Sequence, residues 1–155
     1  MASVGMHCLL ELYGCPKERL DQVEFVEREL RAASEHAGAT WLGQASHRFE
    51  PCGVTAVGLL AESHISMHTW PEIGYAAVDV FTCGDVAMPE TACEYLVTAF
   101  GAERHTLARI PRATELRPRE VAGVDPKAAH MLSGGVGSGD EAYVPVIHHE
   151  VLKGD

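Results

Sequence analysis

The apolar residues of this chain stand in short runs that glycine and proline interrupt, and this pattern limits the folds that the chain can adopt. The longest run, residues 56–61, is six residues long and includes a glycine, whereas a membrane-spanning helix needs about 20 apolar residues. Hydrophobic residues still make up 46% of the 155 positions, as in ordinary globular domains. We therefore expect one folded domain, with or without a tail, and no contact with a membrane.

Two segments have the periodicity of amphipathic helices. In the first, apolar residues recur every three or four positions with charged residues between them: Val23, Val26, Leu30 and Ala33. With Gly38 as a cap after its end, this segment predicts a helix from about residue 18 to residue 37. The second segment begins at Pro89, which suits a first helical turn. Its apolar face holds Cys93, Leu96, Val97 and Phe100.

Segments rich in β-branched and aromatic residues predict strands. The expected strands are His7–Tyr13, Thr40–Phe49, Val54–Leu60, Tyr75–Thr82 and His105–Ile110, and Ile65–Trp70 continues the third after a break near Glu62 and Ser63. The order β-α-β-β-β-α-β predicts an α+β fold, a two-layer α/β sandwich whose antiparallel sheet carries two helices on one face. Because the other sheet face then needs a partner, we expect a homo-oligomer, at least a dimer.

Beyond residue 110 the regular pattern fades. Pro118, Pro126 and the glycine- and serine-rich stretch 133–139 are typical of a linker. Residues 143–152 are apolar again, and the sequence leaves open whether they pair as an edge strand or stay unordered. We therefore divide the chain into a domain of residues 1–115 and a C-terminal extension of residues 116–155.

Charge and cysteine content narrow the functional class. The chain has 12 basic and 22 acidic side chains, a net charge of −10, and this disfavours nucleic-acid binding because phosphate contacts need clustered Lys and Arg. Its five cysteines form no Cys-x-x-Cys pair, and its first residues lack the pattern of a signal peptide. We expect reduced thiols and a cytoplasmic location.

The stretch 62–72 holds most of the residues suited to chemistry, and two interpretations of it find little support. A zinc site on His64 and His68 requires a helix, because only there do positions four apart lie on adjacent turns, and the flanking residues are typical of a strand. A serine hydrolase that uses Ser63, His68 and Asp79 lacks the G-x-S-x-G turn. We expect no metal site.

A third interpretation is self-processing between Glu62 and Ser63. A serine hydroxyl can attack the preceding carbonyl and convert the amide to an ester, and removal of the serine α-proton then cuts the chain. The reaction needs a well-positioned or strained peptide and a nearby base such as histidine. The Glu-Ser dipeptide is common, so the local residues alone do not select this interpretation.

A long string of residues does select it. Residues 62–85, ESHISMHTWPEIGYAAVDVFTCGD, closely resemble the short bacterial and archaeal form of the S-adenosylmethionine decarboxylase family. The resemblance extends to HRFEPCGVT at residues 47–55 and to LYGC at residues 12–15. In all it spans roughly residues 5–110.

The resemblance implies that the chain cuts itself into a β chain of residues 1–62 and an α chain of residues 63–155. Ser63 becomes a pyruvoyl group, the covalent cofactor, which forms a Schiff base with the substrate and takes up the charge left by carbon dioxide without pyridoxal phosphate. His68 matches the histidine that removes the Ser63 α-proton during processing. Cys83 matches the thiol that protonates the decarboxylated carbon.

The resemblance also implies a substrate pocket. Phe49 and Trp70 match aromatic residues that stack on adenine, and Glu72 matches a glutamate that holds the ribose hydroxyls. Glu11, near the first strand, is a further candidate for substrate contact. The expected ligand is therefore a small molecule that carries a nucleoside.

Two residues inside the matched region, Thr55 and His64, are not explained by the resemblance alone. Thr55 stands where the family usually has serine; it keeps the hydroxyl that assists processing, but its methyl group restricts χ1. His64 follows the cleaved serine, and the sequence predicts no role for it.

The resemblance implies decarboxylation of S-adenosylmethionine to the aminopropyl donor for spermidine synthesis. The sequence leaves two alternatives to this function. A pyruvoyl-dependent decarboxylase of ornithine or arginine would keep Ser63, His68 and Cys83. It would need a carboxylate at the distal cation of its substrate, for which the candidates are Glu11, Glu50, Glu72 and Asp85. The second alternative is an uncleaved pseudoenzyme that regulates an active partner.

Overall fold

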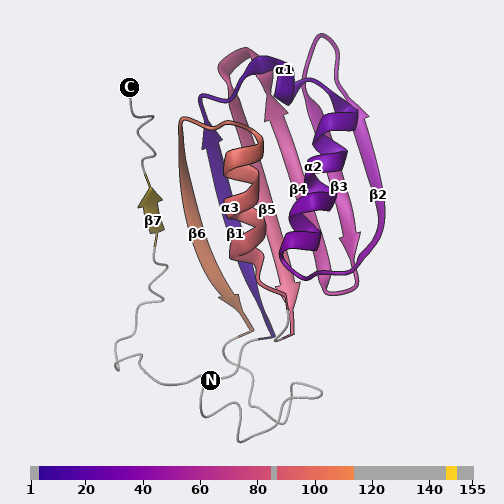
Figure 1. The fold of residues 1–155 in the computed structure, drawn as a ribbon, viewed down its shortest axis with the longest axis vertical. Coiled ribbons are helices and arrows are strands. Elements are labelled where there is room, and N and C mark those ends of the chain that lie inside the picture. The colour runs from indigo at the N-terminus through magenta and orange to yellow at the C-terminus, as the bar shows by residue number, and fades with distance from the viewer. Residues whose placement is uncertain (1–3, 85–86, 114–145, 150–155) are drawn as a thin grey trace, which may run out of the picture.

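The computed structural model describes residues 4–84, 87–113 and 146–149. These residues form an antiparallel sheet with helices on one face (Figure 1). Its elements in chain order are β1 (Gly5–Tyr13), α1 (Lys17–Leu20), α2 (Val23–His36), β2 (Trp41–Arg48), β3 (Val54–Leu60), β4 (Ser63–Trp70), the 3-10 helix η1 (Pro71–Ile73), β5 (Tyr75–Cys83), α3 (Pro89–Ala99), β6 (Arg104–Arg112) and β7 (Val146–His149). The strand order in the sheet is β2-β3-β4-β5-β1-β6-β7.

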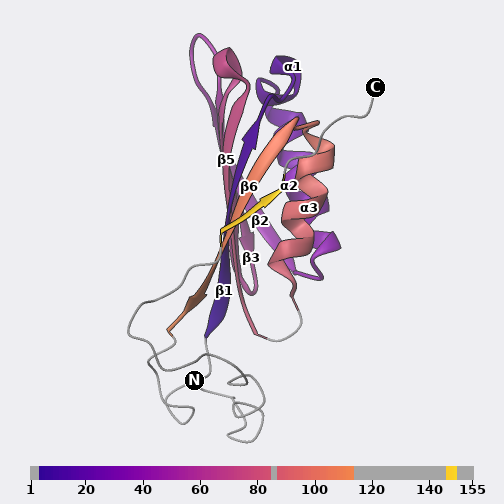
Figure 2. The same ribbon diagram turned by 90° about the vertical axis from the view of Figure 1, so that its left-hand side faces the viewer.

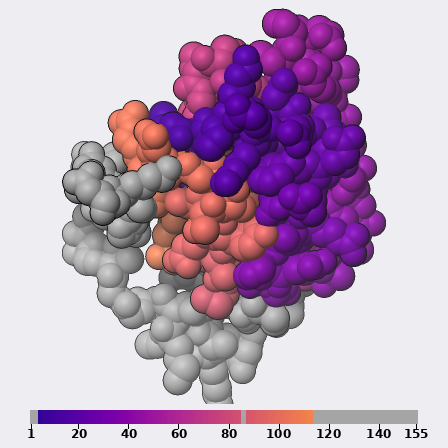
Figure 3. Space-filling view, turned by 45° about the horizontal axis from the view of Figure 1, so that its top comes forward, coloured from indigo at the N-terminus to yellow at the C-terminus, as the bar shows by residue number. Residues whose placement is uncertain are grey.

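Helices α2 and α3 lie side by side on one face of the sheet, and no helix of the described residues lies on the other face (Figure 2). We call these the covered face and the open face. In the space-filling view the segments of the two helices form a continuous surface (Figure 3). This arrangement confirms the predicted α+β sandwich with helices on one face.

The covered face is the hydrophobic core. Along β5 the positions that point to the helices are almost fully buried: Ala76, Val78, Val80 and Thr82. They pack with apolar residues of the helices such as Leu30, Leu96 and Phe100, each at most 1% exposed. Burying one such large side chain stabilises the fold by about 1.5–3 kcal/mol, so the covered face accounts for most of the stability.

The chain between the two main helices forms four strands rather than the expected three. Residues 54–70 are a hairpin, in which Leu60 pairs with Ser63 and the chain reverses at Ala61 and Glu62. Tight hairpin turns usually carry Asn-Gly or Asp-Gly, and Ala-Glu gives no such signal. The prediction of one interrupted strand was therefore wrong.

The expected helix at residues 18–37 is two helices, α1 and α2, with a break at Asp21 and Gln22. The carboxylate of Asp21 accepts a hydrogen bond from the backbone N–H of Gly53, at 2.9 Å, and pairs with Arg48 at 3.0 Å. These contacts fix Asp21 to the loop between β2 and β3. The break therefore depends on residues far away in the sequence.

The C-terminal extension contributes one described segment. Strand β7 pairs antiparallel with β6, as His105 opposite His149 shows, so an edge strand forms within residues 143–152. The proline- and glycine-containing linker, residues 118–139, lies outside the described residues. No helix in the described part of the chain has the length and apolar content needed to cross a membrane.

Candidate active site

The residues that the sequence singles out lie along β4 and the strands beside it, at two places. Glu62, Ser63 and Cys83 lie where β4 begins and β5 ends, because the register pairs Ser63 with Thr82. We call this the serine end of β4. Thr55, His68 and Trp70 lie at the other end of the strand, which we call the histidine end.

At the serine end, Cys83 holds the carbonyl of the bond between Glu62 and Ser63. The Glu62 carbonyl oxygen accepts a hydrogen bond from the Cys83 backbone N–H at 3.0 Å and another from the Cys83 thiol at 2.7 Å. Two donors on one carbonyl oxygen polarise it and stabilise the negative charge that forms there when a nucleophile attacks its carbon.

The backbone at Ser63 is strained. Its φ of 153° lies in a region that residues with a side chain rarely adopt, and such conformations cost of order 1–3 kcal/mol. The strain is stored next to the bond between Glu62 and Ser63. A reaction that cuts this bond also releases the strain.

Thr40 anchors the side chain of Glu62. Its backbone N–H and its hydroxyl bind the two carboxylate oxygens at 2.9 Å and 3.1 Å. The backbone hydrogen bond from Thr40 is the main cause that holds the pKa of Glu62 below its ordinary value. Glu62 is thus fixed at both its carboxylate and its carbonyl, on the two sides of the turn.

A cluster of polar side chains borders the serine end. The Asp79 carboxylate is bound by His64 Nε2 at 2.7 Å, by His7 Nε2 at 3.1 Å and by the hydroxyl of Ser66. The other nitrogen of His64, Nδ1, lies 3.2 Å from the Ser63 hydroxyl. The sequence assigned no role to His64, and only the pairing of β4 with β5 reveals its contact with Asp79.

This geometry rejects two of the arrangements considered from the sequence. Asp79 contacts His64 rather than His68, so the group of Ser63, His68 and Asp79 does not form. His64 and His68 are four positions apart on a strand, or about 13 Å, which is too far for a shared zinc ion. His7, His64 and Asp79 do place ligand atoms within 4.8 Å of one another, although hydrogen bonds already account for their proximity.

At the histidine end, Thr55 and His68 are hydrogen-bonded to each other, with 2.9 Å between Thr55 Oγ1 and His68 Nδ1. The methyl group of Thr55 therefore does not prevent this contact. Trp70, 40% exposed, stacks on Tyr75 with 5.2 Å between ring centroids. The Tyr75 hydroxyl donates a hydrogen bond to Glu11, so Glu11 belongs to this end as well.

Two more predicted pocket residues lie near the histidine end. Phe49, 47% exposed, directly follows β2 and has its ring 4.7 Å from that of His47. Glu72 lies in η1, directly after β4, and accepts a hydrogen bond from the Cys52 thiol at 3.4 Å. Both side chains are thus available to a ligand at the same end as His68.

The two ends are too far apart to act on one bond within a single chain. Ser63 and His68 are five positions apart on one strand, and at about 3.3 Å per residue this is roughly 16 Å. The structure therefore brings Ser63 together with Cys83, and Thr55 together with His68. It does not bring Ser63 to His68.

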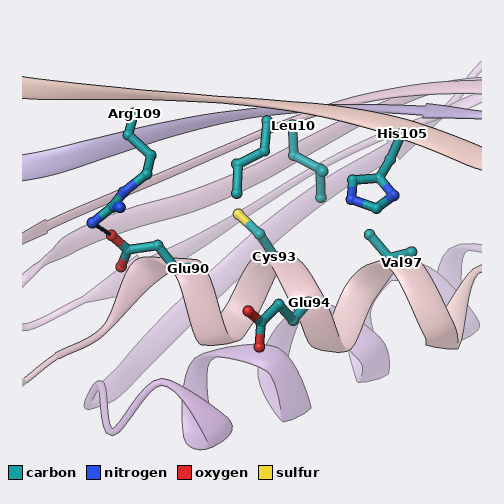
Figure 4. Close-up of a pocket in the computed structure, with 8 residues that line it drawn as sticks. Leu10, Glu90, Cys93, Glu94, Val97, His105 and Arg109 are labelled. Atoms are coloured by element: carbon teal, nitrogen blue, oxygen red, sulfur yellow. Dashed lines mark ion pairs between the residues drawn. The ribbon is translucent and has the colours of Figure 1, made fainter. Parts of the chain in front are cut away.

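A partly open pocket lies elsewhere. It has a volume of about 220 Å³ and sits between α3 and the covered face of β1 and β6 (Figure 4). An ion pair between Glu90 and Arg109 closes one side of it. The sheet separates this cavity from the cluster around Asp79, so it is not part of the candidate site.

Comparisons of the sequence with family models and with individual proteins agree with each other. A family model described as S-adenosylmethionine decarboxylase matches residues 6–113. The S-adenosylmethionine decarboxylase proenzyme of Synechococcus sp. (strain WH7803) is 57% identical over 111 residues, which are 72% of this chain and 87% of that protein. The protein of the same name from Prochlorococcus marinus (strain MIT 9313) is 56% identical over 111 residues, 72% of this chain and 89% of that protein.

A solved structure extends the likeness to the fold. The adenosylmethionine decarboxylase from Aquifex aeolicus VF5 superposes with a TM-score of 0.68 at 39% sequence identity. The match covers 72% of this chain and 92% of that chain. Sequence and architecture therefore point to the same group of proteins.

Proposed function

The chain belongs to the S-adenosylmethionine decarboxylase family, and on this premise we propose that it is a proenzyme that cuts itself between Glu62 and Ser63. The mature enzyme then decarboxylates S-adenosylmethionine, as a carboxy-lyase. The observation that carries the proposal is the Glu62 carbonyl, held by two donors of Cys83 directly before the strained residue Ser63. The proposed catalytic domain is residues 1–115, with residues 116–155 as an extension.

The first step forms an ester. The Ser63 hydroxyl oxygen bonds to the Glu62 carbonyl carbon, and the negative charge on the carbonyl oxygen is stabilised by the N–H and the thiol of Cys83. The bond between the carbonyl carbon and the nitrogen of residue 63 then breaks, and that nitrogen takes up the proton that the hydroxyl lost. Glu62 is now joined to Ser63 through oxygen.

The second step cuts the chain. A base removes the α-proton of Ser63, and the main-chain carboxylate of Glu62 leaves from the Ser63 β-carbon. Water then replaces the nitrogen of residue 63, which departs as ammonia. We assign the base to His68, whose bond to Thr55 fixes the orientation of its ring. The pyruvoyl group so formed supplies the electron sink for decarboxylation.

Cys83 has a second use after cleavage. Before cleavage its thiol is occupied by the carbonyl of Glu62, and departure of that carbonyl leaves the thiol free beside residue 63. A thiol can donate a proton near neutral pH and be recharged from solvent. We therefore assign to Cys83 the protonation of the carbon that loses carbon dioxide.

We propose that a second copy of the chain completes each site. In a dimer whose open faces meet with the β4 strands antiparallel, Ser63 of one protomer lies against His68 of the partner subunit, which removes the separation of about 16 Å. The open face carries the side chains of Leu9 and Leu59, 36% and 57% exposed, and burying them favours this contact. The site then contains the serine end of one protomer and the histidine end of the other.

The residues at the histidine end favour a nucleoside substrate. The exposed rings of Phe49 and Trp70 offer stacking surfaces for adenine, and Glu72 offers a carboxylate for ribose hydroxyls. Glu11 is engaged by Tyr75, so its contact with substrate would be made through the second carboxylate oxygen. The alternatives of an ornithine or arginine decarboxylase and of a pseudoenzyme are less favoured. All five cysteines carry free thiols, which supports a cytoplasmic setting.

Intact-mass spectrometry of the denatured protein tests the cleavage. Two chains, residues 1–62 and residues 63–155 with a pyruvoyl group at the head of the second, are the expected result. Release of carbon dioxide is then measured with S-adenosylmethionine, ornithine and arginine side by side, and only the first should react. A single uncut chain in the purified protein would contradict the proposal.

A further inference from the structure

The hydroxyl of Ser63 is the first member of a chain of hydrogen bonds. His64 Nδ1 lies 3.2 Å from it, and His64 Nε2 lies 2.7 Å from Oδ1 of Asp79. The side chains of His64 and Asp79 are only 35% and 25% exposed. Ser63, His64 and Asp79 thus connect a nucleophilic hydroxyl to a carboxylate through an imidazole ring.

Asp79 determines which nitrogen of His64 carries the proton. Burial alone would raise the pKa of Asp79, but the hydrogen bonds from Ser66, His64 and His7 outweigh it and hold the pKa below its ordinary value. An ionised carboxylate only accepts hydrogen bonds, so His64 Nε2 carries the proton. In the neutral ring Nδ1 then presents its lone pair to the Ser63 hydroxyl.

We propose that His64 is the base that activates Ser63 in the first step of self-cleavage, and that Asp79 positions it. This inference rests on the proposed cleavage between Glu62 and Ser63. As the Ser63 oxygen bonds to the Glu62 carbonyl carbon, its proton passes to His64 Nδ1. When the carbon–nitrogen bond breaks, the imidazolium returns this proton to the nitrogen of residue 63, so His64 ends the step unchanged.

The arrangement divides two proton transfers between two histidines. The first step takes a proton from the Ser63 oxygen, which His64 contacts in the same chain. The second takes a proton from the Ser63 α-carbon, for which we assigned His68 of the partner subunit. Ser63, His64 and Asp79 have the connectivity of the Ser-His-Asp group of hydrolases, but the bond they act on belongs to their own chain.

The experiment compares His64→Ala with His68→Ala in the full-length chain. Purified variants are followed for cleavage by denaturing electrophoresis and mass spectrometry, with and without hydroxylamine, which cuts an ester but not an amide. His64→Ala should cleave at least about 100-fold more slowly than the wild type. It should accumulate as an uncut amide that hydroxylamine leaves intact, and added imidazole should accelerate its cleavage.

His68→Ala should behave differently, because it is blocked after ester formation. Hydroxylamine should therefore cut it between Glu62 and Ser63. His36→Ala is the matched control: His36 lies at the end of α2, bonded to the backbone of Ala32, and its replacement should leave the cleavage rate at the wild-type value. Circular dichroism verifies that each variant folds.

A second variant tests the positioning role of Asp79. Asp79→Asn keeps the shape of the side chain, but its amide can donate to His64 Nε2 and so select the wrong tautomer; cleavage should slow at least about tenfold.

Three outcomes would overturn the inference while the cleavage itself stands: His64→Ala at the wild-type rate, His64→Ala stalled as a hydroxylamine-sensitive ester, or Asp79→Asn at the wild-type rate. An uncut wild-type chain would overturn the proposed function instead.

Discussion

The two ends of β4 lie on the same strand, and in the proposed mechanism they hold complementary parts of one reaction. The serine end has the proposed cleavage site, the proposed nucleophile Ser63 and the two donors of Cys83 that bind the Glu62 carbonyl. The histidine end has His68, the proposed second base, together with Thr55 and the aromatic residues. Because about 16 Å separates them, each end is incomplete in its own chain. A replacement at one end should therefore be compensated by a partner chain that is intact at that end.

The largest predicted effect is a complete loss of cleavage that a second chain restores. Ser63→Ala has no nucleophile and should never be cut, and His68→Ala should stall when expressed alone. In a mixed dimer, the His68→Ala chain has an intact Ser63 and meets the intact His68 of the partner subunit. Mass spectrometry after co-expression should then find the His68→Ala chain cut between Glu62 and Ser63.

The matched control for this experiment is Ser46→Ala, an exposed serine on β2, which should be cut normally when expressed alone. If the His68→Ala chain stays uncut in verified mixed dimers, the two ends do not act across the dimer.

The next effect belongs to the serine end alone. Cys83→Ala removes the thiol but keeps the backbone N–H on the Glu62 carbonyl, so the chain should still be cut, up to about 100-fold more slowly. Decarboxylation by the cut enzyme should fall further, because the proton donor is gone. Cleavage rate and carbon dioxide release, measured separately, check this. Wild-type turnover by Cys83→Ala would exclude the second role of the thiol.

The sequence predicts most of the elements and, through one matched string, most of the candidate site residues. It fails where the outcome depends on pairing between distant residues. The break after α1 depends on the contact of Asp21 with Gly53, and the proposed role of His64 depends on a strand register that places Asp79 beside it. The motif assigns His68 to the α-proton of Ser63. On a strand, the five positions between them correspond to roughly 16 Å, so the two side chains do not meet within one chain.

A smaller effect is expected from the histidine end. Glu72→Gln should raise the KM for S-adenosylmethionine about tenfold and change kcat little, because a hydrogen bond to a charged group contributes about 1.5 kcal/mol. Cleavage between Glu62 and Ser63 should be unaffected, since the proposed cleavage steps use no proton or hydrogen bond from Glu72. Glu35→Gln, on the exposed side of α2, is the control. An unchanged KM for Glu72→Gln would remove Glu72 from the pocket.

The smallest effect concerns the anchor of Glu62. Thr40→Val removes one of two hydrogen bonds to the Glu62 carboxylate but keeps the backbone N–H. It should reduce the free energy of unfolding by about 0.5–1.5 kcal/mol at pH 7, measured by urea titration of the uncut Ser63→Ala chain.

The pH dependence of this effect follows from the pKa of Glu62. Because folding lowers that pKa, the contribution of the carboxylate is present above its unfolded pKa and is lost as the pH falls through its folded pKa. The difference between Thr40→Val and its parent should therefore shrink on acidification. A difference that stays constant from neutral to acidic pH would show that Thr40 stabilises the turn without acting through the charge of Glu62.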